Sequence, residues 1–98
     1  MADIMSSIDV EKSLKGMDGW SHNDVFNSIS KEFSFDSFQS ATTFVAHVCS
    51  IADDMGNYPD ILIHNGTEVK ITAMDSEAGG VTEEDIALIE SLEILFSG

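Results

Sequence analysis

The clearest hydrophobic pattern lies in the middle of the chain. Apolar residues recur there at three- and four-residue steps: Phe38, Ala41, Val45, Val48, Ala52 and Met55. This spacing predicts an amphipathic helix, with Asp36 or Ser37 placed to cap its start. Gly56 is placed to end it in a left-handed conformation, and Pro59 prevents the helix from resuming.

Two weaker patterns precede this helix. After a loose start over residues 1–8, a short helix is expected from Asp9 to Met17, with Val10 and Leu14 on one face. Apolar residues at alternate positions then predict a strand from Val25 to Phe35 with one buried face. A helical turn is the local alternative at its beginning, but Phe33-Ser34-Phe35 favours the strand.

A hairpin is expected around Asn65-Gly66, the strongest short turn signal in the chain. Its strands are Ile61 to His64 and Thr67 to Thr72. A strict two-residue turn would pair His64 with Thr67 and divide the apolar residues between the two faces. A one-residue bulge would instead place Ile61 and Ile63 on the same face as Val69 and Ile71, so two registers remain open.

The C-terminal segment predicts a last helix. Thr82 with Asp85 resembles a capping box, and the helical stripe that follows consists of Ile86, Ile89, Leu92 or Glu93, and Phe96. The segment carries more apolar side chains than one stripe against a sheet requires, which predicts association with another copy.

Together these elements run helix, strand, strand, helix, strand, strand, helix. We therefore expect one α+β domain over residues 1–98, a four-stranded antiparallel sheet with three helices on one face. The sequence shows neither an apolar run of about 20 residues nor a signal-peptide pattern. A cytoplasmic protein without membrane contact is expected.

The charge balance narrows the range of partners. Eighteen acidic and four basic residues give a net charge of −14, which repels phosphate backbones and anionic lipids. Direct binding to nucleic acid is therefore not expected. Solubility or adaptation to salty surroundings is the simplest explanation of the charge, and a basic protein partner is the alternative.

The cysteine and histidines give no sign of a metal centre. Cys49 is the only cysteine, and its place beside Val45 and Val48 predicts a packed structural thiol. The spacing of His22, His47 and His64 matches no metal motif. Neither a metal nor another cofactor is expected.

A series of segments from about Trp20 to the C-terminus resembles the pterin-4a-carbinolamine dehydratases, also called dimerisation cofactors of a homeodomain transcription factor. They are Gly19-Trp20, Phe33-Ser34-Phe35-Asp36-Ser37-Phe38, Ala52-Asp53-Asp54-Met55, Asn57-Tyr58-Pro59-Asp60, Val69-Lys70-Ile71-Thr72 and Gly79-Gly80-Val81-Thr82-Glu83-Glu84-Asp85. Each is weak alone, but the joint match is specific. The resemblance implies the α+β fold, dimers that join into tetramers, and dehydration of a 4a-hydroxytetrahydropterin.

The expected catalytic positions are nevertheless substituted. The resemblance places three family histidines at Asn57, Tyr58 and Ser76, and one extra residue lies between Pro59 and Val69. Asparagine cannot exchange a proton, serine is too weak an acid without a base beside it, and tyrosine is a poor base near pH 7. The retained residues Asp53, Pro59 and Asp85 are expected at the pterin site.

Carboxylates offer substitute proton acceptors, and the candidates are Asp53, Asp75, Glu77 and Asp85. The simpler interpretation is that they solvate a loop and cap a helix. Two functions remain: a pterin dehydratase whose activity is lost or strongly reduced, or a noncatalytic assembly or protein-binding module. A dehydratase-like branch that helps assemble the carboxylase of carboxysomes looks similar, although it tends to lose the Gly-Gly-Val-Thr segment retained here.

Overall fold

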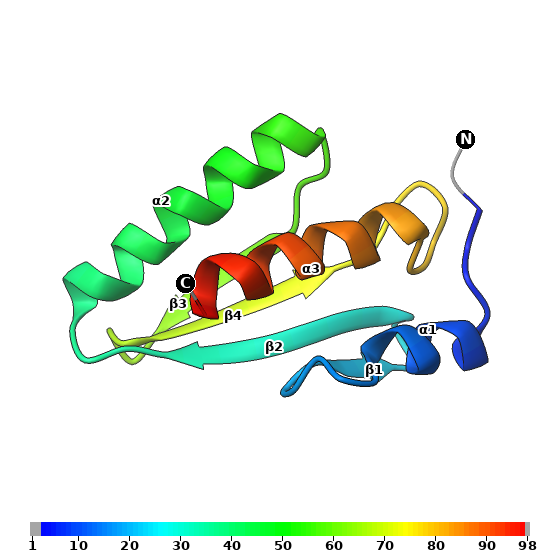
Figure 1. Cartoon of the computed structure of the whole chain (residues 1–98), viewed down its shortest axis with the longest axis horizontal. Helices are drawn as coiled ribbons and strands as arrows, with labels where there is room; N and C mark the ends of the chain where they lie inside the picture. Colours follow the sequence, from blue (N-terminus) through cyan, green and yellow to red (C-terminus); the bar gives the residue numbers. More distant parts are fainter. Residues whose placement is uncertain (1–2, 98) are drawn as a thin grey trace.

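The computed structural model describes residues 3–97 and has the expected order of elements. Three helices and four strands alternate along the chain (Figure 1): α1 Ser7–Leu14, β1 Ser21–Asn23, β2 Ser28–Ser34, α2 Phe38–Met55, β3 Asp60–His64, β4 Glu68–Ala73 and α3 Glu83–Ser97. The α+β class and the antiparallel sheet are confirmed. None of the helices within residues 3–97 is long and apolar enough to cross a bilayer.

The sheet has the strand order β1-β2-β4-β3, so two hairpins meet through the central pair β2 and β4. Helices α2 and α3 lie across one face of the sheet in Figure 1, and α1 lies over its β1 end. Alternate residues of β2 and β4 point into a core that all three helices share. The buried residues of this core, from strands, helices and loops together, are Val10, Leu14, Trp20, Ile29, Phe33, Ala41, Phe44, Val48, Val69, Ile71, Ala73, Val81, Leu88, Ile89 and Leu92.

The strand expected from Val25 begins later, at Ser28. Val25 and Phe26 are 84% and 70% exposed, because they belong to the turn that joins β1 to β2. Asn23 Oδ1 accepts the backbone N–H groups of both residues, at 2.9 and 3.1 Å. The side chain of Asn23 thus replaces ladder hydrogen bonds.

The first helix also lies earlier than expected. It spans Ser7–Leu14 rather than Asp9 to Met17, because the Ser6 side chain caps it by accepting from the Asp9 N–H at 3.2 Å. Val10 and Leu14 are buried, as expected. A loose start was expected over residues 1–8, of which the first two lie outside the described residues. The rest of this segment is held in place, because the Met5 N–H donates to the Val81 carbonyl at 2.8 Å and α1 begins at Ser7.

Both ends of α2 are confirmed. Ser37 accepts from the Ser40 N–H at 3.0 Å, and Gly56 adopts φ 66° after the last turn. The expectation for Cys49 is wrong: the thiol is exposed, because the adjacent Val48 takes the inward direction and the next residue turns about 100° away. Phe38 and Met55, at the ends of the predicted stripe, are 60% and 40% exposed.

The hairpin adopts the bulged alternative. Ile63 pairs with Val69 and Ile61 with Ile71, so these four apolar side chains share the helix-covered face. Three residues separate β3 from β4, and both Asn65 and Gly66 have positive φ, at 53° and 74°. Burial of one face decides the register, because a one-residue slip would turn these side chains toward solvent.

Candidate functional site

The corner after α2 brings Asn57 against the start of α3. Asn57 Nδ2 donates to Asp85 Oδ1 at 3.0 Å, and Asp85 is buried, with 1% of its surface exposed. The other oxygen, Oδ2, accepts the Thr82 N–H at 2.9 Å and the Thr82 hydroxyl at 3.2 Å. The predicted capping contact is therefore present, and three donors occupy the Asp85 carboxylate.

The other polar side chains of this corner are exposed to solvent. Tyr58 is 65% exposed and Pro59 is half-buried. Asp53 is exposed on the last turn of α2, where its carbonyl accepts the Gly56 N–H at 3.3 Å. Within residues 3–97, no side-chain hydrogen bond joins Tyr58 or Asp53 to Asn57 or Asp85. The corner can present a phenol and a carboxylate, but it does not hold them against the buried pair.

The third substituted position lies in the turn between β4 and α3. Ser76 and Glu77 are exposed, and Asp75 Oδ1 accepts the N–H groups of Glu77 and Ala78, both at 2.9 Å. The Asp75 N–H donates to the Gly80 carbonyl at 2.8 Å, which closes the turn. Asp75 thus acts locally as a turn-forming side chain, which agrees with the simpler interpretation given to the carboxylates.

Gly80 packs closely against two neighbouring side chains. A side-chain carbon there would overlap the Asn27 amide and would lie 2.9 Å from the Ile4 side chain. The turn before α3 is therefore pressed against the β1–β2 turn and the N-terminal segment. This contact supplies a structural reason for the Gly-Gly segment, in addition to any role implied by resemblance.

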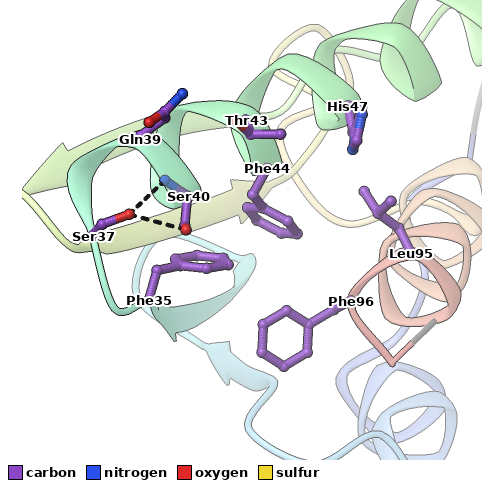
Figure 2. Close-up of a pocket in the computed structure, with 9 residues that line it drawn as sticks. All are labelled: Phe35, Ser37, Gln39, Ser40, Thr43, Phe44, His47, Leu95 and Phe96. Atoms are coloured by element: carbon purple, nitrogen blue, oxygen red, sulfur yellow. Dashed lines mark hydrogen bonds between the residues drawn. The ribbon is translucent and has the colours of Figure 1, made fainter.

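Sequence reasoning missed a recess at the other end of α2. It has a volume of about 470 Å³ and lies between the first half of α2 and the end of α3, as Figure 2 shows. Its lining comprises Phe35, Ser37, Gln39, Ser40, Thr43, Phe44, His47, Leu95 and Phe96. None of the predicted site residues lines it. The signal in the sequence was the polar stripe of Gln39, Thr43 and His47 beside Phe44.

Aromatic rings that contact one another form one side of this recess. Phe44 stands 5.0 Å from Phe35 and 6.0 Å from Phe96, measured between ring centroids. Phe96 also meets the buried Phe33 at 4.7 Å in an edge arrangement. Tilted and edge contacts of this kind are favourable, so the rings support one another and leave an apolar surface facing hydroxyl groups.

A polar cluster beneath α3 was also missed. Glu93 Oε2 accepts from Lys31 Nζ at 2.7 Å and from Trp20 Nε1 at 2.8 Å. Lys31 lies on the helix-covered face of β2, with its ammonium group 4.8 Å from the Phe33 ring centroid. A charged residue between Ile29 and Phe33 in the alternating strand was the available signal, since a lysine there must find a partner.

The histidines occupy three separate surroundings. His47 borders the recess of Figure 2. His64 Nε2 lies 2.8 Å from Glu32 Oε1, and ligand atoms of Glu32, His64 and Glu68 lie within 4.8 Å of one another on the open sheet face. The side chain of His22 is 1% exposed, between α1 and β1. Contacts between elements that are distant in the sequence create these surroundings, so residue spacing alone could not reveal them.

Comparison with known proteins gives one consistent result. The family model described as pterin 4 alpha carbinolamine dehydratase matches residues 3–95. A protein of Roseiflexus sp. named for this dehydratase is 33% identical over 93 residues, covering 95% of this chain and 97% of its own length. One of Haloarcula marismortui is 33% identical over 92 residues, covering 94% and 95%.

Two solved structures share the fold. A transcriptional coactivator/pterin dehydratase from Brucella melitensis superposes with a TM-score of 0.86 at 24% identity, covering 94% of this chain and 97% of that one. A pterin dehydratase-like protein described as a RuBisCO assembly factor in the alpha-carboxysome gives 0.65 at 22% identity, covering 79% and 88%.

Proposed function

Because the chain belongs to the pterin 4 alpha carbinolamine dehydratase family, we propose that it is a dehydratase-like protein whose catalytic activity is lost or strongly reduced. The observation that carries this proposal is the hydrogen bond from Asn57 Nδ2 to Asp85 Oδ1 at 3.0 Å. At the position where the resemblance implies a histidine, the side chain anchors a helix cap.

The chemistry of the reaction explains why this matters. Loss of the 4a-hydroxyl needs one proton delivered to the leaving oxygen and one removed from a ring nitrogen, and imidazole serves both purposes near neutrality. The Asn57 amide does neither. Asp85 is a carboxylate, but its bonds to Asn57 and Thr82 commit both oxygens to donors already in place.

The corner retains groups that can bind a planar pterin. Tyr58 offers an exposed hydroxyl, and Asp53 and Glu77 offer exposed carboxylates that can accept N–H groups. Asn57, Asp75, Ser76 and Asp85 complete the proposed site, with Pro59 shaping the turn. In this proposal, the site still binds a pterin although its catalytic activity is lost or strongly reduced. The protein acts in the cytoplasm, and the proposed reaction site uses no metal or cofactor.

The experiment compares turnover of a 4a-hydroxytetrahydropterin by this protein with that of a histidine-containing relative, in the same assay. We expect far slower turnover here, because general acid–base groups each contribute roughly 10²- to 10⁴-fold. Restoring histidine with N57H, Y58H and S76H together should raise the rate substantially. The matched control is N57Q, Y58F and S76A together, which changes the same positions without adding a titrating group.

Two outcomes would overturn the proposal. Wild-type turnover equal to the relative's would mean that other residues replace the histidines, and Asp53, Asp85 and Tyr58 would be tested first. No gain from the triple restoration, with the fold intact by circular dichroism, would mean that the pocket itself is remodelled. That second result would favour the noncatalytic alternative.

The alternative is an assembly or protein-binding module on the same fold, and the recess between α2 and α3 favours it. A groove with a phenylalanine wall and a hydroxyl rim is typical of a protein-binding surface. The solved structure described as a RuBisCO assembly factor has a similar fold. Under this alternative, the recess contacts a protein partner such as RuBisCO.

This alternative is tested by titrating purified RuBisCO with the protein in a calorimeter. T43E places a charge in the recess and should abolish binding, whereas S50E adds the same charge at an exposed α2 position outside the lining. Equal loss in both variants would indicate general charge repulsion. No binding by the wild-type protein would remove RuBisCO as the partner.

A further inference from the structure

The open face of the sheet gathers one imidazole and two carboxylates. Glu32 of β2, His64 of β3 and Glu68 of β4 each offer one ligand atom there, and these atoms lie within 4.8 Å of one another. Within residues 3–97, no other three histidine, cysteine or acidic side chains come together so closely. Imidazole and carboxylate groups are ordinary ligands of divalent transition metals.

The register of the hairpin places two of these groups side by side. His64 pairs with Glu68 across the bulged turn, whereas a strict two-residue turn would pair it with Thr67. Ile63 and Val69 face the helices, so the residues next to them, His64 and Glu68, face the opposite side of the sheet. Burial of the apolar residues therefore also determines where the imidazole and the carboxylate meet.

The third group comes from the strand on the other side of β4. Glu32 pairs with Lys70 in the β2–β4 ladder, so it is the diagonal neighbour of Glu68. Its side chain reaches across β4, and Glu32 Oε1 lies 2.8 Å from His64 Nε2. Side chains from both flanking strands thus converge above β4.

The pair of His64 and Glu32 accounts for only two of the three groups. Among the described residues 3–97, the Glu68 carboxylate forms no hydrogen bond or ion pair with another side chain. Lys70 is exposed on the same face, and in that part of the chain it forms no ion pair with either glutamate. Two carboxylates this close repel each other, and one imidazole can supply at most one positive charge. A divalent cation would balance both.

The distances suit one shared ion. Ligand atoms on a single Zn²⁺, at bond lengths of about 2.0–2.2 Å, stand roughly 3 to 4.3 Å apart, depending on the angle between the bonds. The cluster spans separations from 2.8 Å to at most 4.8 Å, and rotation of the glutamate side chains covers the small difference. We propose that Glu32, His64 and Glu68 form a site for a divalent transition-metal cation such as Zn²⁺.

The scaffold and the access route fit this proposal. The three ligands stand on three adjacent, hydrogen-bonded strands, which hold ligands more precisely than loops do. The side chains of Glu32 and His64 are 50% and 34% exposed, so a cation reaches them directly from solvent. Three protein ligands leave a fourth position for water or an external ligand, as in open zinc sites. A bound ion would tie β2 and β3 together across β4.

The site is independent of the proposed function. His64 ends β3 at the hairpin, whereas the Asn57 corner precedes the start of the same strand at Asp60. The cluster also lies on the face of the sheet that the helices leave open, away from the recess between α2 and α3. Failure of either proposal would therefore leave the other one standing.

The test uses Zn²⁺ itself, in the full chain carrying C49S, since the exposed Cys49 thiol would otherwise compete. Excess Mg²⁺ in the buffer occupies isolated carboxylates, because Mg²⁺ prefers oxygen ligands and competes poorly for an imidazole. Calorimetry should show one Zn²⁺ per chain. E68Q and H64N should each weaken binding by about 10-fold or more, since loss of even a supporting group at a metal site costs roughly 10- to 100-fold.

Two matched controls separate this site from general attraction of a cation to an acidic protein. D60N removes one charge from an exposed position on the same strand and the same face as His64, and H47N removes an exposed histidine from α2. Both should leave the Zn²⁺ affinity unchanged. Equal losses in D60N and E68Q would mean that net charge alone attracts the ion, which would overturn the proposal.

A second measurement locates the ion without any substitution in the site. Long-range ¹H–¹⁵N spectra of the imidazole rings should show the His64 nitrogen resonances moving on addition of Zn²⁺, while those of His22 and His47 stay in place. No binding at millimolar Zn²⁺ would leave the cluster as an ion pair only. Binding that survives both H64N and E68Q, or that moves the His22 resonances instead, would contradict the assignment.

Discussion

Asn57 and Asp85, 28 residues apart in the chain, are joined by a hydrogen bond of 3.0 Å that ties the corner after α2 to the first turn of α3. The same carboxylate accepts the Thr82 N–H and hydroxyl. One buried side chain therefore supports both the candidate site and the start of a core helix. Substitutions in this corner should affect stability as well as ligand binding.

We predict that D85A destabilises the protein by about 2–3 kcal/mol, because it removes a helix cap and leaves buried donors without an acceptor. The free energy of unfolding in urea measures this loss. E84A is the matched control, since Glu84 is exposed on the same turn of α3. A D85A variant as stable as E84A would show that water replaces the carboxylate.

Gly56 offers a test of backbone conformation alone. It has φ 66°, and no atom lies within 4 Å of where a side-chain carbon would stand. We predict that G56A costs roughly 1 kcal/mol in thermal or urea unfolding, since the left-handed conformation disfavours alanine. G56N should recover part of this loss, because asparagine tolerates that conformation. Equal stability of G56A and wild type would contradict a strained cap.

The ion pair beneath α3 should be costly to break from one side. Lys31 is 13% exposed at its side chain and binds Glu93, so E93Q leaves a largely buried ammonium group without its counter-charge. We predict a loss of about 2–4 kcal/mol in E93Q, with a much smaller loss when K31M is added. Additive losses in the double variant would mean that the pair itself contributes little.

Association is expected from the end of α3. Ile94 is 73% exposed and Phe96 is 44% exposed, although Leu88, Ile89 and Leu92 of the same helix are buried. We predict that light scattering at micromolar protein gives the mass of a dimer or tetramer in moderate salt. I94S should shift the protein toward the monomer, with E90Q, at an exposed α3 position, as the control.

Salt concentration should change this equilibrium in a defined direction. Each chain carries a net charge of −14, so two copies repel when screening is weak. Lowering the ionic strength should therefore favour the monomer. A monomeric mass at every salt concentration would show that the exposed apolar residues of α3 do not form an interface between copies.

The sequence alone determined the features that depend on residues a few positions apart. Ser37 and Gly56 define the ends of α2, and Thr82 with Asp85 marks the start of α3, because caps involve neighbours within one helical turn. The alternation of apolar residues also predicted the strands. The sequence limited the hairpin to two registers, and the structure has the bulged one.

Tertiary structure decided everything that joins distant parts of the chain. The bond from Trp20 to Glu93 spans 73 positions, and the one from Lys31 to Glu93 spans 62. No local propensity encodes these pairings, since they follow from the strand order β1-β2-β4-β3 and from the way α3 crosses the sheet. The surroundings of His22 arise in the same way, from α1 packing on β1. Local chemistry thus placed the elements, and their packing chose which polar side chains would meet.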